Sequence, residues 1–224
     1  MCIIIYKKEG IKLEQETLKR CFKRNSDGAG IAWKEGKNPW VFKKGIMTWE
    51  EFEDYNKNLK EEKITKVIHF RIRTHGDKDE KNTHPFLITP VKGVKNIENP
   101  LAGVLKVNQA LLFHNGILGL SPESYEISDT ALLTRLLSLM DFNERNYIDV
   151  INKMINNSRI LLITSKKLYR IGKWYEDNGV FFSNTNYKEK IFEYSFNLTN
   201  PIYMKKSKNI ENDIIEFKNK KYTL

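Results

Sequence analysis

Apolar residues occur in short runs separated by polar segments, a pattern that predicts several strands and a few helices. Residues 2–6 form an unbroken apolar run rich in isoleucine, which predicts a buried strand. Polar and apolar residues alternate from residue 64 onward, which predicts a strand with one polar face that runs into a turn at 74–76. Further strands are expected at 39–44, 111–114, 159–164, 168–173 and 179–183.

Helical spacing of apolar residues predicts four helices. The first covers 13–24, and the second begins after a capping box formed by Thr48 and Glu51. A third helix is expected to begin at Ser128, a residue type that caps helix N-termini, and a fourth is expected over 145–156. The third helix is expected to bury a stripe made of Leu132, Leu133, Leu136, Leu137 and Met140.

Strands and helices come in blocks rather than in strict alternation, which favours an α+β domain with mostly antiparallel sheets. Few periodic signals occur over 77–110, so a long loop is expected there. The pattern also weakens beyond residue 188. We therefore expect a single domain over 1–224, with a core of about 2–185 and a C-terminal extension of 186–224.

Composition places the chain among folded proteins and narrows the classes of partner. Hydrophobic residues make up 40% of the 224 residues, and the net charge is +10. The excess charge is spread over the whole chain and no nucleic-acid motif occurs, so a solvated lysine-rich surface is expected rather than a nucleic acid partner. No apolar run approaches the roughly 18 residues of a membrane span, and none resembles a signal peptide. We expect a cytoplasmic location and no membrane partner.

The chain contains two cysteines, Cys2 and Cys21. Their spacing is not that of a metal site, and no cofactor motif occurs, so neither a metal nor a cofactor is expected. A disulfide between them would require an oxidising compartment, which nothing in the sequence indicates. Cys21 lies on the apolar face of the first predicted helix and is expected to be structural.

Cys2 offers unusual chemistry if Met1 is removed. The residue would then carry a thiol and a free α-amine, so that one residue could act as nucleophile and base. The two groups titrate near about 8.5 and about 8, which suits proton transfer near neutral pH. The alternative is that Cys2 simply packs with the apolar residues that follow it.

Three other polar features have both a structural and a chemical interpretation. Arg71 and Arg73 share one face of a predicted strand, where they could be plain surface or could bind a carboxylate. Asn115 and Gly116 fit a hairpin turn, but their amide and backbone N–H groups also suit an oxyanion hole. Asp129 in the first turn of a helix is favoured by the helix dipole alone.

Six short motifs occur in one order along the chain. Together they resemble the class II glutamine amidotransferase domain of the N-terminal nucleophile (Ntn) hydrolase family, over roughly residues 2–185. Each motif alone is unspecific, whereas the ordered set is specific. The motifs are Met1-Cys2, Asp27-Gly28-Ala29-Gly30, Arg71-Ile72-Arg73-Thr74-His75-Gly76, His84-Pro85-Phe86, His114-Asn115-Gly116 and Ser128-Asp129-Thr130.

The resemblance implies a four-layer αββα sandwich of two antiparallel sheets between helices. It also implies that Cys2 attacks the side-chain amide of glutamine and that a thioester forms, while Asn115 and Gly116 stabilise the oxyanion. The remaining residues that the resemblance assigns to the site would bind substrate. Arg71 would pair with the α-carboxylate, Asp129 would hold the α-ammonium group, and Thr74, His75 and Gly116 would complete the substrate contacts.

Two positions depart from the family pattern. Ile72 replaces an aromatic residue, and Ala131 replaces an acidic residue that often follows the third helix's first turn. The chain also has no room after residue 185 for a domain that accepts ammonia. We therefore expect a stand-alone amidohydrolase that acts on glutamine or another γ-glutamyl amide, with a separate protein as a candidate ammonia acceptor. The alternative is an inactive Ntn-fold binding or regulatory module that retains Met1.

Overall fold

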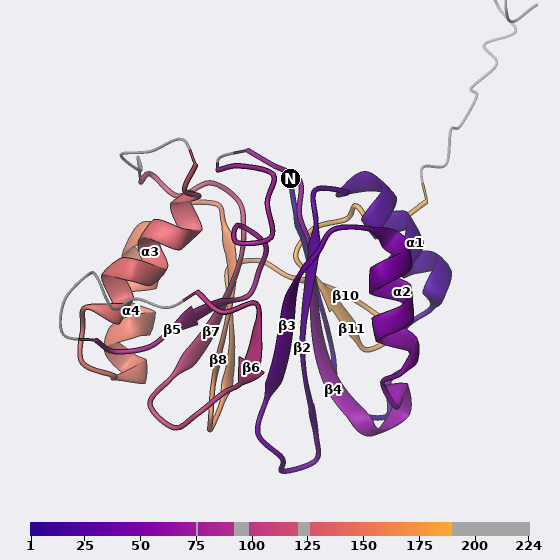
Figure 1. Ribbon diagram of the computed structural model, residues 1–224, viewed down its shortest axis with the longest axis horizontal. Helices are drawn as coiled ribbons and strands as arrows, with labels where there is room; N and C mark the ends of the chain where they lie inside the picture. The colour runs from indigo at the N-terminus through magenta and orange to yellow at the C-terminus, as the bar shows by residue number, and fades with distance from the viewer. Residues whose placement is uncertain (75, 92–98, 121–125, 190–224) are drawn as a thin grey trace, which may run out of the picture. The chain divides into compact units, whose positions relative to one another are not determined.

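The computed structural model describes residues 1–189 except 75, 92–98 and 121–125. Two antiparallel sheets face each other, α1 and α2 cover the outer face of one, and α3 and α4 cover the outer face of the other (Figure 1). This arrangement confirms the predicted α+β class and the αββα layers. Most of the predicted extension over 186–224 lies outside the described residues, so the single-domain expectation stays a prediction.

The larger sheet has seven strands, and β1 (Ile3–Lys7) lies in its interior. β1 pairs with β4 on one side and with β11 on the other, and all five of its residues are buried, as the apolar run predicted. The strand order is β10-β11-β1-β4-β2-β3-β6. The other strands are β2 (Ala29–Glu35), β3 (Val41–Ile46), β4 (Ile64–Phe70), β6 (Ala102–Val104), β10 (Tyr175–Asp177) and β11 (Val180–Phe182).

The smaller sheet has four strands in the order β5-β7-β8-β9. β7 (Ala110–Asn115) and β8 (Arg159–Thr164) form its centre, and all six residues of β7 are buried. The edge strands are β5 (Phe86–Ile88) and β9 (Leu168–Ile171).

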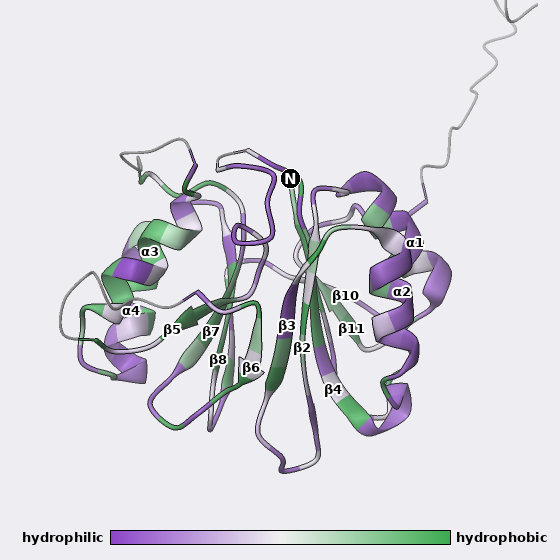
Figure 2. Cartoon of the chain, viewed as in Figure 1, coloured by the Kyte–Doolittle hydropathy of each residue, from purple (hydrophilic) through white to green (hydrophobic). Residues whose placement is uncertain are grey.

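The helices begin where their capping residues predict. The capping box of Thr48 and Glu51 starts α2 (Trp49–Lys57), and Ser128 caps α3 (Asp129–Ser138) by accepting from the Ala131 N–H. α1 (Gln15–Arg24) and α4 (Glu144–Met154) match the other two predicted helices, and a short 3₁₀ helix covers Glu61–Lys63. Figure 2 shows mostly hydrophilic residues on α1 and α2, whereas α3 also carries hydrophobic residues.

Apolar side chains form three layers of core. One lies between the large sheet and α1 and α2, one lies between the two sheets, and one lies between the small sheet and α3 and α4. Cys21 is fully buried in the first layer, as expected for a structural cysteine. The expected leucine stripe of α3 is wrong at Leu136, which is 41% exposed. The helix instead buries Thr130 and Thr134 beside Leu133 and Leu137, because these four share one face at helical spacing.

Two further sequence interpretations need correction. The expected loop over 77–110 contains β5 and β6, whose three residues each are too short to show a period. The polar face predicted for the strand that begins at residue 64 is largely buried. β4 ends at Phe70, and His69 and Arg71 are 0% and 3% exposed, whereas Arg73 beyond the strand is exposed.

A close backbone approach fixes the sheet end nearest Cys2. A Cβ atom added to Gly30 would lie 1.7 Å from the carbonyl oxygen of His84. This glycine of the Asp27–Gly30 motif therefore lets β2 pass close to the loop before β5.

Candidate active site

Cys2 lies directly before β1, and its sulfur contacts the backbone of Ile72. The Sγ atom donates to the Ile72 carbonyl oxygen at 3.3 Å and accepts from the Ile72 N–H at 3.4 Å. The residue is half-buried, whereas Met1 is 61% exposed. Burial raises the pKa of the Cys2 thiol, although the Ile72 hydrogen bond and the charge of Arg71 act in the opposite direction. At neutral pH the sulfur is therefore a thiol, and it needs a base before it can attack a carbonyl.

Arg71 and Arg73, which the sequence placed together, lie in different environments. Arg71 is 3% exposed, and its guanidinium donates to the carbonyl oxygens of Asp77 at 2.7 Å and Gly76 at 3.3 Å. Burial lowers the Arg71 pKa, while the charges of Cys2 and Asp27 raise it. Arg73 is exposed, so the surface interpretation holds for Arg73 and not for Arg71.

The turn at Asp27 and Gly28 holds the arginine segment in place. The backbone bonds run from Asp27 N to Arg71 O at 2.9 Å and from Arg71 N to Gly28 O at 2.8 Å. The Asp27 carboxylate accepts from the Arg73 N–H at 2.8 Å and pairs with Lys78 at 3.0 Å. Burial opposes ionisation of Asp27, but these bonds lower its pKa overall. The motif glycines and Asp27 thus set the path of residues 71–73 beside Cys2.

Asp129 lies at the start of α3, where its carboxylate binds backbone. One oxygen accepts from the Leu118 N–H at 2.8 Å and the other from the Thr130 N–H at 2.7 Å. A Cβ atom on Gly76 would lie 2.8 Å from the Ser128 nitrogen, so the segment after Arg71 packs against this helix start. Because Gly76 also accepts from Arg71, the structure connects the Arg71 and Asp129 regions through one glycine.

Asn115 ends β7 and is fully buried. Its Nδ2 donates to the hydroxyl oxygen of Ser183 at 2.8 Å. Gly116 has φ of 147°, and an added Cβ would lie 2.2 Å from Ser158 Oγ, so this position requires glycine. The hairpin interpretation of this pair is wrong, because β7 continues toward α3 rather than turning directly into a neighbouring strand.

Residues 183 and 184 join the site although the sequence did not single them out. The Ile4 N–H donates to Ser183 Oγ at 2.8 Å, and the Ser183 N–H donates to Ile4 O at 2.9 Å. Asn184 Nδ2 donates to the Cys2 carbonyl oxygen at 2.6 Å. The only signal in the sequence was two polar residues at the end of a predicted strand, which is common at strand ends.

Three buried histidines lie beneath these residues. The rings of His69 and His84 are 4.0 Å apart, His69 Nε2 lies 3.1 Å from His114 O, and His114 Nδ1 lies 2.8 Å from Thr130 Oγ1. Burial lowers the pKa of His69 to about 3 and of His114 to about 4, and it holds the pKa of His84 well below its ordinary value. All three are therefore neutral at physiological pH and act as dipoles rather than charges.

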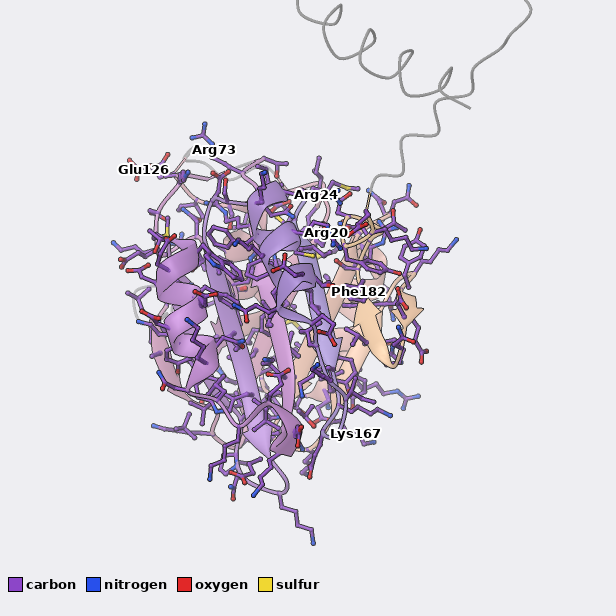
Figure 3. The ribbon with its side chains drawn as sticks, turned by 90° about the vertical axis from the view of Figure 1, so that its right-hand side faces the viewer. Arg20, Arg24, Arg73, Glu126, Lys167 and Phe182 are labelled. Atoms are coloured by element: carbon purple, nitrogen blue, oxygen red, sulfur yellow. The ribbon has the colours of Figure 1, made fainter. Side chains whose placement is uncertain are left out.

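Of the two other residues predicted to contact the substrate, Thr74 is exposed and His75 lies outside the described residues. Within the described ranges, no cluster of three or more His, Cys, Asp and Glu side chains could hold a metal ion, and no helix is long and apolar enough to cross a bilayer. A surface cavity of about 380 Å³ is lined in part by Lys167, which lies at the opposite end of the described unit from Arg73 and Glu126 (Figure 3).

Comparison with known proteins supports the fold. No family model and no curated protein sequence matches the chain. A matching solved structure is the glutamine phosphoribosylpyrophosphate amidotransferase from B. subtilis, complexed with ADP and GMP, with 15% sequence identity and a TM-score of 0.50. The match covers 81% of this chain and 41% of that one, so the chain spans about two fifths of its length. The chain therefore has the αββα sandwich fold of an Ntn-type glutamine amidotransferase.

Proposed function

We propose that this protein is a stand-alone glutamine amidotransferase-like amidohydrolase. Cys2 attacks the side-chain amide of glutamine, or of another γ-glutamyl amide, and the products are glutamate and ammonia. The observation that carries the proposal is the connected set of hydrogen bonds around Cys2. These bonds link its sulfur to the backbone after Arg71, and link its strand through Ser183 to Asn115.

The first step requires removal of Met1, which converts the Cys2 nitrogen from an amide into an amine. Because the thiol pKa is raised by burial, the amine must take the thiol proton, directly or through a water molecule. The sulfur then forms a bond to the amide carbon, and the carbonyl π electrons move to oxygen. The resulting tetrahedral intermediate carries a negative oxygen.

Asn115 and Gly116 stabilise that oxygen through the side-chain amide and a backbone N–H. Loss of one such donor typically costs about 2.7–4 kcal/mol of transition-state stabilisation. Collapse of the intermediate breaks the C–N bond, and the α-ammonium returns its proton to the departing ammonia. Water then attacks the thioester with the same amine as base, which releases glutamate and restores the Cys2 thiol.

Arg71 binds the α-carboxylate of the substrate and Asp129 binds its α-ammonium group, and Thr74, His75 and Gly116 are proposed as further substrate contacts. Both charged groups are already bonded to backbone, Arg71 to Asp77 O and Asp129 to Leu118 N. A ligand must therefore share or replace these bonds. Opposite charges at the two ends would select a free amino acid over a peptide-bonded glutamine, whose backbone carries neither charge.

The ammonia that is produced is proposed to pass to a separate acceptor protein or to be released. The reaction needs neither a metal nor a cofactor, since nucleophile, base and oxyanion donors all belong to the chain. We propose a cytoplasmic location, where free glutamine is available as substrate.

The decisive experiment combines intact mass with thioester trapping. Native protein should lack Met1, hydrolyse glutamine, and be labelled once by an electrophilic glutamine analogue. Cys2→Ala should lose both hydrolysis and labelling, whereas Cys21→Ala, which removes the other thiol, should retain both. Labelling that persists in Cys2→Ala, or full hydrolysis by protein that keeps Met1, would overturn the proposal.

A second candidate function is an inactive Ntn-fold binding module that retains Met1. Backbone bonds already satisfy polar atoms of Arg71 and Asp129, which favours a stable scaffold as well as a site. Calorimetric titration with glutamine and with glutamate separates the two functions. Binding without turnover by protein that carries Met1 would support the module.

A further inference from the structure

Ser183 joins the strand of the nucleophile to the end of β11 (Val180–Phe182). The residue is fully buried and exchanges two hydrogen bonds with Ile4, one through its backbone N–H and one through its side-chain oxygen. In a regular ladder a backbone carbonyl would accept from Ile4. The hydroxyl oxygen therefore takes the place of a backbone acceptor two residues after Cys2.

The same hydroxyl oxygen also contacts the other sheet. Asn115 Nδ2 donates to Ser183 Oγ at 2.8 Å, while the Ile4 N–H donates to it at the same distance. One buried atom thus connects the strand that carries Cys2 with the residue proposed to stabilise the oxyanion. A displacement of either strand would be transmitted through this atom.

The hydrogen bonds of Asn115 are incomplete in this orientation. Among the described residues its Oδ1 is buried and has no hydrogen-bond partner. Such an orphaned acceptor typically costs about 1–3 kcal/mol. Half a turn of the carboxamide exchanges Oδ1 and Nδ2. The Ser183 hydroxyl could then donate to Oδ1 while still accepting from Ile4, because a serine hydroxyl both donates and accepts.

In the rotated state Nδ2 occupies the position now held by Oδ1, and its N–H groups no longer donate to Ser183. An oxyanion hole needs a donor, and a carbonyl oxygen facing a developing negative charge would repel it. Resting on the proposed function, we propose that Ser183 is a positioning residue that holds the Asn115 carboxamide with its nitrogen toward the oxyanion. Ser183 itself does not touch the substrate.

Kinetics provide the first test, because a donor used only in the transition state changes kcat rather than KM. Ser183→Ala should lower kcat roughly 10- to 100-fold, a part of what loss of the whole donor costs, with KM within about twofold of wild type. Ser183→Thr keeps the hydroxyl and should recover most of the loss. Ser138→Ala is the matched control, since it removes another fully buried serine hydroxyl and should leave kcat unchanged.

A double mutant separates positioning from general damage. In an Asn115→Ala background, Ser183→Ala should lower kcat no further, because the group that it orients is gone. Alkylation of Cys2 by iodoacetamide, which needs no oxyanion hole, should proceed at the wild-type rate in Ser183→Ala. Multiplying effects in the double mutant, or a slowed alkylation, would assign Ser183 a purely structural role and overturn the proposal.

A spectroscopic measurement that needs no turnover keeps the test independent of the proposed function. In Cys2→Ala protein labelled with ¹⁵N-asparagine, the Asn115 side-chain signals are those lost in Asn115→Asp. Ser183→Ala should move or average them, and Ser183→Thr should preserve them. If wild type does not hydrolyse glutamine, the proposed function fails while this spectrum still decides on Ser183. Unmoved signals in Ser183→Ala would overturn the positioning role.

Discussion

The two ends of the β1–β4 pair bury polar groups in opposite ways. At the end where β1 stops and β4 begins, Lys7 and Lys66 are buried beside Glu61. At the end where β1 begins and β4 stops, the half-buried thiol of Cys2 and the buried neutral ring of His69 lie near the buried guanidinium of Arg71. Both ends belong to the same two strands, which pair in one register from Ile3 opposite Phe70 to Lys7 opposite Lys66.

At the lysine end the buried cations are paired with the chain's own groups, and Glu61 Oε1, which has no hydrogen bond among the described residues, lies 3.4 Å from Lys7 Nζ. Lys66 donates to Glu61 and to Asn56 Oδ1 at 2.7 Å, and Lys7 donates to Ile11 O at 2.9 Å and to Glu61. Burial lowers the pKa of Lys66, whereas the Glu61 carboxylate raises it. Each buried lysine in this cluster is thus paired with a carboxylate and with further acceptors, and loss of the carboxylate would leave a buried charge uncompensated.

The cysteine end is left incomplete within the described residues. Both ring nitrogens of His84 and the Asn115 Oδ1 atom are buried without a hydrogen-bond partner there. Buried polar groups are normally paired, but unpaired atoms also occur at Ser138 in α3 and Tyr147 in α4, so an unpaired atom alone does not mark a site. The difference between the ends teaches that buried polarity supports a candidate site where it is left unpaired beside the proposed nucleophile.

The largest expected effect comes from the glycines at the two ends of β2. Gly30→Ala would put a methyl group 1.7 Å from the His84 carbonyl oxygen, whereas nothing lies within 4 Å of a Cβ on Gly36. We expect Gly30→Ala to abolish folding or to cost well over about 3 kcal/mol. Gly36→Ala should cost about 1–2 kcal/mol from its left-handed backbone. Denaturant unfolding measures both, and equal effects would contradict the close approach.

The second prediction tests the lysine end. Glu61→Gln removes the carboxylate from two buried lysines, and breaking a buried ion pair in this way costs about 3–5 kcal/mol. Because Glu61 is partly exposed, the lower part of that range is expected. Glutamine hydrolysis per folded molecule should not change. A loss of kcat in the folded protein would show that the two ends are coupled and would break the comparison.

The third prediction tests the cysteine end. Asp129→Asn keeps the shape of the side chain but removes its charge, so kcat/KM should fall roughly 10- to 150-fold, equivalent to about 1.5–3 kcal/mol for a charged hydrogen bond. The free energy of unfolding should fall by about 1–3 kcal/mol, because the amide oxygen can accept from one backbone N–H and the other is left unpaired. An unchanged kcat/KM with a large loss of stability would make Asp129 a purely structural residue.

Much of the fold follows from local signals in the sequence. The apolar run before Tyr6, the capping box at Thr48 and the N-cap Ser128 each report an interaction within a few residues, and each prediction is confirmed. β5 and β6 could not be predicted, because three-residue strands depend on partners far away in the chain. Similarly, the sequence could not show that Leu136 is exposed, because its exposure depends on which face of α3 packs against the sheet.

The site residues also divide into those that the sequence reveals locally and those that depend on distant contacts. Cys2, Arg71, Asn115 and Asp129 stand out because their residue types suit one chemistry, and their roles stay predictions. Ser183 could not be found from sequence, since its importance depends on hydrogen bonds to residues 68 and 179 positions away. Of the buried histidines, His84 and His114 stood in motifs and His69 did not, and nothing local in the sequence reveals that a histidine will be buried.

The smallest expected effect concerns those histidines. It distinguishes the cysteine end from the lysine end by the pH dependence of the free energy of unfolding. The folded-state pKa of His69 is about 3, far below the ordinary value of 6.5, because burial disfavours the charged ring. Below pH 6.5 the unfolded chain binds a proton at this residue that the folded chain does not, so stability falls as pH falls from 6.5 toward 3. At pH 5.5 the loss is about 1.4 kcal/mol for one histidine.

His69→Gln removes this contribution. Denaturant unfolding at pH 7 and pH 5.5, where exposed carboxylates stay ionised, should show a decrease in stability for wild type that is smaller by about 1.4 kcal/mol in the variant. Glu61→Gln, at the lysine end, should keep the wild-type difference between the two pH values. If His69→Gln has the wild-type pH dependence, then His69 is protonated in the folded protein, and the cysteine end does not hold the neutral buried histidine that separates it from the lysine end.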